Sequence, residues 1–216
     1  MKKIICFFII VVSFGFAQKP MTAEKPAGYH LHDGFFLSMT GGPAFGDIVL
    51  EATNAGFKKM EVSGTGFQFD FKIGTILSKG SDVALSFDVI GRIISNPSFK
   101  VDGISLTTKD SVTASDALYG VGITKYFMPS NAFVSATIGL GTFTIQQNKT
   151  KATSESGIGV HVKAGKEWWV GDDWGIGAAV GVAILSAKDK KDSSMPNYSG
   201  TLSTTRFFIE FNSTFN

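Results

Sequence analysis

Three histidines are the side chains of this sequence that could carry acid–base or metal chemistry near neutral pH. His30 and His32 stand two residues apart in "GYHLHDG", a spacing at which two imidazoles can share a metal ion. No cysteine or fixed set of partners accompanies them, so we interpret the segment as a flexible leader. We therefore predict no metal site and no cofactor.

His161 is the third histidine, and it lies on the polar face of a predicted strand. Ser86, Ser135 and Glu167 lie on polar faces as well and could come near its imidazole. A histidine activates a nucleophile only within hydrogen-bond reach. Alternation along a strand does not define the relative heights of these residues, so we assign no catalytic residue and expect a non-enzymatic protein.

Charged side chains occupy the polar faces of the predicted strands in equal numbers of acids and bases. They are Asp70, Lys72, Asp88, Arg92, Lys163, Glu167, Arg206 and Glu210. A lone buried charge is costly, whereas paired and hydrogen-bonded charges are tolerated. If these faces are enclosed, we expect a salt-bridge network; if they are solvated, the charges need not interact.

Within that network we expect contacts between neighbouring strands and contacts across the interior. Asp70 or Lys72 can meet Arg92 or Asp88, because their strands are adjacent. Arg206 and Glu210 can reach across an interior about one side chain wide.

A two-residue alternation of apolar and polar side chains positions these charges. In "GFQFDFKIGTIL" the phenylalanines fall on one face, and Gln68, Asp70 and Lys72 fall on the other. The same pattern predicts strands over 34–45, 64–77, 82–95, 116–128, 131–146, 157–170, 174–187 and 201–215. Short turns alternate with long polar connections over 46–63, 96–115, 147–156 and 188–200.

The beginning of the chain reads as an export signal. "MKKIICFFIIVVSFGFAQ" has two lysines, an apolar run and a small residue, which predicts a signal peptide over residues 1–17. Its removal takes away Cys6 and leaves a chain without disulfides. A leader over residues 18–33 and one domain over 34–216 follow. Beyond the signal there is no apolar run of about 18 residues, so a membrane could be crossed only by strands.

These patterns favour an all-β fold, an eight-stranded antiparallel up-and-down transmembrane β-barrel. Glycines are frequent on the polar faces, which suits the narrow interior of a small barrel, and large aromatic residues gather near strand ends. Short turns at one end and long loops at the other are typical of outer-membrane barrels, whose short turns face the periplasm. The alternative is a soluble exported barrel or sandwich with its apolar face inward.

The tryptophans mark a predicted membrane boundary. Trp168 and Trp174 flank the "VGDD" turn on the apolar parity, and an indole prefers the level where hydrocarbon meets water. Trp169 has the opposite parity and should close the periplasmic end of the interior or lie in the turn. In a soluble protein the three would form an ordinary core cluster. The last strand carries its own apolar row, formed by Phe207, Ile209, Phe211 and Phe215.

Over essentially the whole mature chain, the sequence resembles the small eight-stranded outer-membrane barrels of bacteria, the OmpA/OmpX/OmpW-like superfamily. The likeness is carried by the signal peptide, by "GKEWWVGDDWGIGAAVGV" and by the aromatic last strand ending in "FNSTFN". It implies a place in the bacterial outer membrane, in contact with lipid and lipopolysaccharide. It also implies insertion by the barrel-insertion machinery, which reads the last strand. Such barrels usually end on phenylalanine, whereas here Asn216 follows Phe215.

We therefore predict a monomeric, non-enzymatic outer-membrane protein with a side-chain-filled, ion-paired interior. Its role would be structural in the envelope, or binding of an unknown ligand by its surface loops. Two alternatives stay open: a lipid A modifying enzyme, which some barrels of this size resemble, and a narrow, porin-like conduit for small apolar molecules. The net charge of +2, without a basic arm, argues against nucleic acid.

Overall fold

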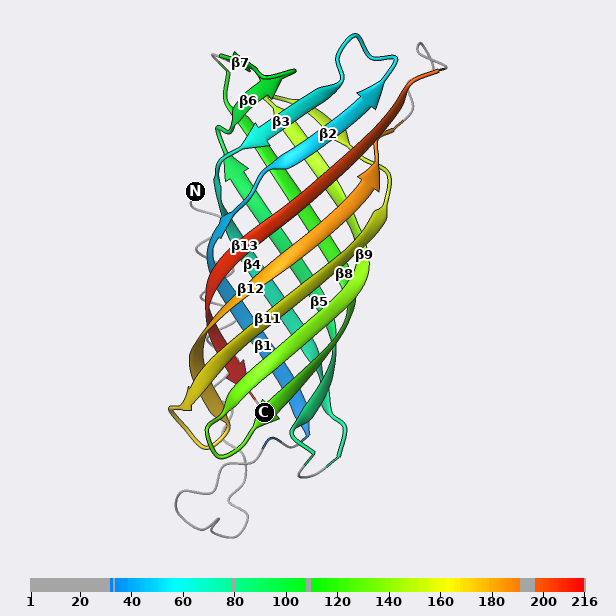
Figure 1. Cartoon of the computed structure of the whole chain (residues 1–216). Helices are drawn as coiled ribbons and strands as arrows, with labels where there is room; N and C mark the ends of the chain where they lie inside the picture. The colour runs from blue at the N-terminus through cyan, green and yellow to red at the C-terminus, as the bar shows by residue number, and fades with distance from the viewer. Residues whose placement is uncertain (1–31, 33, 79–80, 108–109, 191–196, 216) are drawn as a thin grey trace.

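A computed structural model describes residues 32, 34–78, 81–107, 110–190 and 197–215 (Figure 1). The predicted signal peptide, His30 and all of the predicted leader except His32 lie outside the described residues. Within the described part of the chain, no helix is long and apolar enough to span a membrane.

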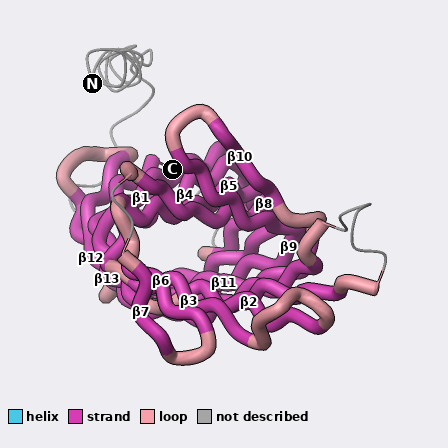
Figure 2. Tube along the Cα trace, turned by 90° about the horizontal axis from the view of Figure 1, so that it is seen from above, coloured by secondary structure: helices cyan, strands magenta, loops and turns pink. Residues whose placement is uncertain are grey.

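Eight long strands form a closed antiparallel barrel, which confirms the predicted fold class. They are β1 (Phe35–Phe45), β4 (Thr65–Ile76), β5 (Val83–Ser95), β8 (Val112–Phe127), β9 (Ala132–Gln147), β11 (Gly157–Trp169), β12 (Trp174–Lys188) and β13 (Ser199–Phe215). Each pairs with the next in chain order, and β13 pairs with β1 to close the ring. Viewed along the axis, the strands encircle one common interior (Figure 2).

Five shorter strands lie in segments that we expected to be connections only, and that expectation is wrong. They are β2 (Ile48–Thr53), β3 (Lys59–Ser63), β6 (Ser98–Val101), β7 (Ile104–Leu106) and β10 (Thr150–Thr153). β2 continues the pairing of β1 along β13, while β3 and β6 continue the pairing of β4 and β5. The hydrogen-bonded wall therefore continues past the loop ends of β1, β4 and β5. We call β2, β3, β6 and β7 the loop-end sheet; it lies at the top of Figure 1.

Apolar side chains cover the outward face of the barrel. Val121 and Phe211 are 65% and 72% exposed, and similar exposure recurs on every one of the eight barrel strands. An apolar exterior of this extent is the reverse of a soluble barrel and matches a wall in contact with acyl chains.

The interior is layered along the barrel axis. At the short-turn end, the buried apolar residues are Phe36, Ile76, Ala84, Tyr126, Phe133 and Ala179. At the loop end, they are Ile48, Leu50, Val62, Ile94, Ala114, Phe143, Leu185, Ala187 and Leu202. The buried charged side chains lie between these two apolar layers.

A tyrosine contact joins the two ends of the connection between β12 and β13. The Tyr198 hydroxyl donates to Asp189 Oδ2 at 2.5 Å, beside the backbone hydrogen bond from Asp189 N to Gly200 O. Burial, together with the hydrogen bond to Asp189 and the charge of that carboxylate, raises the pKa of Tyr198 to about 12. Because the folded pKa is raised, this contact stabilises the fold below about pH 10 and loses its effect as pH rises toward 12.

We expect a spectrophotometric titration of the intact protein, minus that of the Tyr198→Phe variant, to show phenolate absorbance with a midpoint of about 12. In the Asp189→Asn background the midpoint should move toward 10, because the neighbouring negative charge is gone. A midpoint near 10 in the unchanged protein would contradict the assigned contact.

Candidate functional site

All eight charged residues assigned to the polar faces are buried inside the barrel. They project from β4, β5, β11 and β13, and a ninth buried charge, Asp116, projects from β8. Asp116 is not among the eight predicted interior charges; it lies at the start of the predicted strand, whereas β8 begins at Val112. Its parity with Gly120 and Gly122 was the signal that could have identified it.

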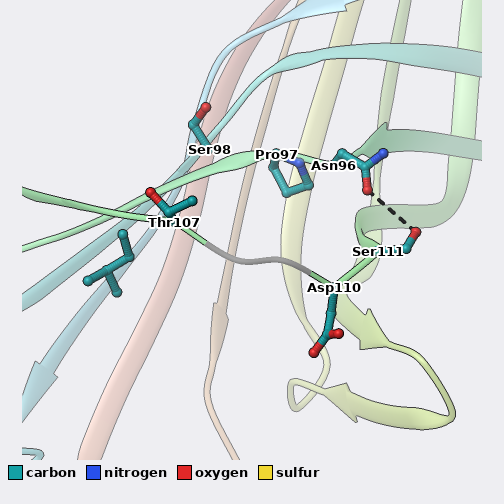
Figure 3. Close-up of a pocket in the computed structure, with 7 residues that line it drawn as sticks. Asn96, Pro97, Ser98, Thr107, Asp110 and Ser111 are labelled. Atoms are coloured by element: carbon teal, nitrogen blue, oxygen red, sulfur yellow. Dashed lines mark hydrogen bonds between the residues drawn. The ribbon is translucent and has the colours of Figure 1, made fainter.

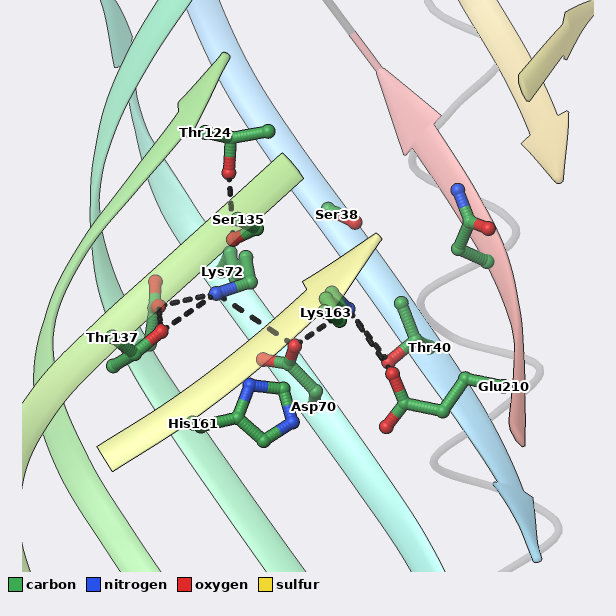
Figure 4. Close-up of polar contacts among 12 residues, drawn as sticks. Ser38, Thr40, Asp70, Lys72, Thr124, Ser135, Thr137, His161, Lys163 and Glu210 are labelled. Carbon is green, nitrogen blue, oxygen red and sulfur yellow. Dashed lines mark hydrogen bonds and ion pairs between the residues drawn. The ribbon is translucent and has the colours of Figure 1, made fainter. Parts of the chain in front are cut away.

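Two lysines bridge carboxylates in the middle of the interior (Figure 4). The Lys72 ammonium contacts Asp88, its direct neighbour across β4 and β5, and lies 3.7 Å from Asp70 Oδ2. The Lys163 ammonium lies 2.7 Å from Asp70 Oδ2 and 3.1 Å from Glu210 Oε2. Lys163 projects from β11 and Asp70 from β4, so this bridge crosses the interior.

Gln68 links this group to two arginines nearer the loop end. Its amide nitrogen donates to Glu210 Oε1 at 2.7 Å, and its amide oxygen accepts from Arg206 Nε at 2.6 Å. Asp116 then accepts from both guanidinium groups, 2.5 Å from Arg206 Nη1 and 2.8 Å from Arg92 Nε. Predicted contacts of Arg92 with Asp70 or Lys72 are replaced by this contact with Asp116, which lies directly opposite on β8.

Together these groups form one connected series, which we call the lumen chain. In order, it consists of Asp88, Lys72, Asp70, Lys163, Glu210, Gln68, Arg206, Asp116 and Arg92. Carboxylates alternate with cations, with one neutral amide between Glu210 and Arg206. Such mutual pairing offsets the cost of removing ions from water only when the remaining donors and acceptors are also bonded.

A backbone carbonyl between the end of β1 and the start of β2 supplies one of these additional hydrogen bonds. Gly46 has φ of 142°, and a Cβ there would lie 2.3 Å from the carbonyl oxygen of Thr205. The Gly46 carbonyl accepts from Arg92 Nη1 at 2.6 Å, and Thr204 Oγ1 accepts from Nη2 at 3.1 Å. The interruption between the two strands therefore presents a backbone acceptor to the last cation of the lumen chain.

Glycines on the inner wall make room for the lumen chain. A Cβ at Gly122 would lie 2.1 Å from Asp88 Oδ2, and one at Gly66 would lie 2.8 Å from Cγ of Arg92. These two glycines are therefore needed for the space they leave for the lumen chain.

Glu167 does not join the lumen chain, although it belongs to the same predicted set. Its Oε1 accepts from Asn212 at 2.6 Å, Thr214 at 2.7 Å and Tyr126 at 3.4 Å. Within the described residues no cation forms a salt bridge with it, and its Oε2 has no hydrogen-bond partner. It lies between the lumen chain and the apolar layer at the short-turn end.

His161 lies against the lumen chain. Its ring stacks on Phe208 at a centroid distance of 4.5 Å, and Nε2 lies 3.2 Å from the Gln68 amide nitrogen. Among the hydrogen bonds of the described residues, none joins it to Ser86, Ser135 or Glu167. Ser86 donates to Asp88 at 2.5 Å and Ser135 accepts from Thr124 at 2.9 Å.

Three buried side chains are close enough together to hold a metal ion. Single ligand atoms of Asp70, His161 and Glu210 lie within 4.8 Å of one another. The Lys163 ammonium already bonds both carboxylates, so it is the cation of this cluster in the structure.

At the short-turn end, His32 closes the interior, and the interpretation of a flexible leader is wrong at this residue. Its side chain is fully buried, and Nε2 lies 2.8 Å from Asn131 Oδ1. The imidazole stacks on Tyr126 at 3.7 Å and lies 5.1 Å from the Trp169 ring. An imidazole between aromatic rings packs as part of the apolar layer, which sequence alternation could not reveal because His32 lies outside the strands.

Trp168, Trp174 and the apolar row of the last strand lie on the outside of the barrel. Trp168 is 55% exposed, and Trp174 packs edge-on against Phe215 at 5.3 Å. Phe207, Ile209 and Phe211 are exposed on the same face of β13.

The loop-end sheet carries a surface pocket of about 520 Å³ (Figure 3). It is lined by Asn96, Pro97, Ser98, Leu106, Thr107, Asp110 and Ser111. Asn96 Oδ1 accepts a hydrogen bond from Ser111 Oγ at 3.4 Å. This bond joins the segment between β5 and β6 to the segment between β7 and β8 at the edge of the pocket.

Comparisons of the sequence with protein-family profiles and with curated proteins yield no match. The fold is similar to solved outer-membrane barrels. The solid-state NMR structure of outer membrane protein AlkL in lipid bilayers matches with a TM-score of 0.53 at 14% identity, over 92% of this chain and 96% of that one. OprG of Pseudomonas aeruginosa matches with a TM-score of 0.49 at 11% identity, over 86% and 98%.

At these identities the likeness concerns the fold alone. A closed ring of eight antiparallel strands, an apolar exterior and a charged, packed interior agree with it. The chain is an eight-stranded transmembrane β-barrel of the outer-membrane type.

Proposed function

We propose that this chain is a non-enzymatic outer-membrane protein whose barrel is closed along its axis. It serves the envelope through its wall and through the loop-end sheet, which presents a binding surface outside the hydrocarbon.

The lumen chain carries this proposal. Its nine side chains are buried and connect opposite walls of the barrel, so a solute or hydrated ion would have to separate paired charges in order to pass. Apolar layers at both ends add to this closure. In a small barrel, filling of the interior by side chains is the expected outcome of its diameter.

The imidazole of His161 stacks on Phe208 and contacts the Gln68 amide, which supports a packing role for this histidine. The loop-end sheet supports the binding role, because strands and a rimmed pocket make these connections an ordered surface.

The test is single-channel recording of the purified protein in planar bilayers, together with swelling of protein-loaded liposomes in sugars and in small apolar solutes. We expect no regular conductance steps and no swelling above that of empty liposomes. Steady unitary currents, or swelling selective for apolar solutes, would contradict a barrel that is closed along its axis. A change in the lipid A mass profile on expression of the protein, if His161→Ala abolished it, would contradict a non-enzymatic role.

A further inference from the structure

Within the eight barrel strands, the outward-facing charged residues are all positive. The eight barrel strands lie wholly within the described residues, and all five of their carboxylates point inward. Their outward charged residues are Lys125, Lys166 and Lys188. Lys188 lies at the loop end, whereas Lys125 and Lys166 lie two and three residues before the short-turn ends of β8 and β11.

Both lysines of the short-turn end direct their ammonium groups toward that rim. Lys125 Nζ donates to the Ser81 carbonyl at 2.7 Å, in the turn between β4 and β5. Lys166 Nζ lies 5.8 Å from the ring centroid of Trp168, which is two residues nearer the end of the same strand. Long basic side chains behave in this way when their stems lie along hydrocarbon and their charges lie at headgroup level.

Only β9 separates the two lysines, and its outward residues there are small. Val134 lies opposite Lys125, and Ala132 lies opposite Lys166. Two interstrand spacings and two residues along the strand put the lysine Cα atoms roughly 12 Å apart. In the structure Lys125 Nζ points toward the turn between β4 and β5, away from β9, so its flexible four-carbon stem must rotate across Val134 to bind the same group as Lys166.

We propose that Lys125 and Lys166 form a binding site for the phosphate of an anionic phospholipid in the leaflet at the short-turn end, which in outer-membrane barrels is the periplasmic leaflet. The two ammonium groups bind the phosphate, Ala132 and Val134 leave room for the glycerol, and Trp168 flanks the acyl chains. A carboxylate on this wall would repel the lipid; the outward face has none in the eight strands, and the acidic residues described at this rim, Asp82, Asp172 and Asp173, lie in the turns beyond the strand ends. This site is independent of whether the barrel conducts.

The experiment uses fluorescence of the full protein in phosphatidylcholine vesicles, in a Trp169→Phe, Trp174→Phe background that leaves Trp168 as the reporter. Phosphatidylglycerol or phosphatidylcholine, brominated on the acyl chain near the headgroup, is titrated in as quencher. We expect Trp168 to be quenched by the anionic lipid at a mole fraction about 25-fold lower than by the zwitterionic lipid, which is about fivefold for each lysine. Each of Lys125→Gln and Lys166→Gln should reduce this selectivity about fivefold, the equivalent of about 1 kcal/mol for one lysine near a charged membrane surface.

Lys188→Gln is the matched control, because it removes an outward lysine at the opposite rim and should leave the selectivity unchanged. The shift of each folded variant on an unheated gel separates loss of the site from loss of the barrel. Equal quenching by the two lipids in the parent, selectivity that survives in the double lysine variant, or loss of selectivity in Lys188→Gln would each overturn the proposal.

Discussion

Replacement of Asp116 by asparagine is expected to lower the free energy of unfolding by about 3–5 kcal/mol, the range for breaking a buried ion pair by removing one partner. Asp116 is the only carboxylate within salt-bridge distance of Arg92 and Arg206 among the described residues. Both arginines are fully buried, so the asparagine variant would leave two uncompensated cations in the interior. Reversible urea unfolding in phospholipid vesicles, followed by tryptophan fluorescence, measures the loss.

The control is Asp172→Asn, which makes the same chemical change at an exposed position in the turn between β11 and β12. It should alter stability by less than about 0.5 kcal/mol. If Asp116→Asn is as stable as the parent, the arginines must be neutralised by other groups, and the loop-side half of the lumen chain is misassigned.

Two-residue alternation was sufficient to predict the eight barrel strands and the inward side of the eight charges assigned to the polar faces. A slip of one residue would move a whole strand's apolar set to the wrong face, so the inward parity of Asp70, Lys72 and Asp88 is strongly specified. Lys72 and Asp88 lie directly opposite because a short turn joins β4 and β5, and a short turn limits the register.

Alternation could not predict the pairs that cross the interior. The bridges from Lys163 to Asp70 and from Arg206 to Asp116 depend on the stagger of the strands around the ring, which no local pattern encodes. The pairing of Arg92 with Asp116 depends on strands joined by a long connection, so its register was equally inaccessible.

The loop-end strands were missed for a different reason. β3, β6 and β7 have five, four and three residues, too short for a period of two to stand out from polar loops. They form because β2 pairs with the free edge of β13, and β3, β6 and β7 then pair in turn with the strand before them, which is a tertiary effect. The buried position of His32 likewise depends on Tyr126 and Asn131 meeting it from the far side of the ring.

Replacement of Lys163 by methionine is the second change expected to cost about 3–5 kcal/mol of unfolding free energy. Methionine keeps an unbranched stem of similar length but removes the ammonium that joins Asp70 to Glu210. Among the polar contacts of the described residues, Asp70 then keeps Lys72 at 3.7 Å and Glu210 keeps the Gln68 amide at 2.7 Å. The same vesicle-based urea titration measures the effect.

Neutralising a carboxylate in the methionine background distinguishes lost pairing from lost packing. If unpaired negative charge causes the instability, Lys163→Met with Glu210→Gln should be more stable than Lys163→Met alone, with a coupling of about 0.5–3 kcal/mol, the range for residues in one salt-bridge network. If the two changes in unfolding free energy simply add, Lys163 stabilises the barrel through the packing of its stem, and its ion pairs with Asp70 and Glu210 contribute nothing. Rescue by Glu210→Gln would instead mean that the barrel is held closed by mutual neutralisation of its walls, since the ammonium on β11 is what connects β4 with β13.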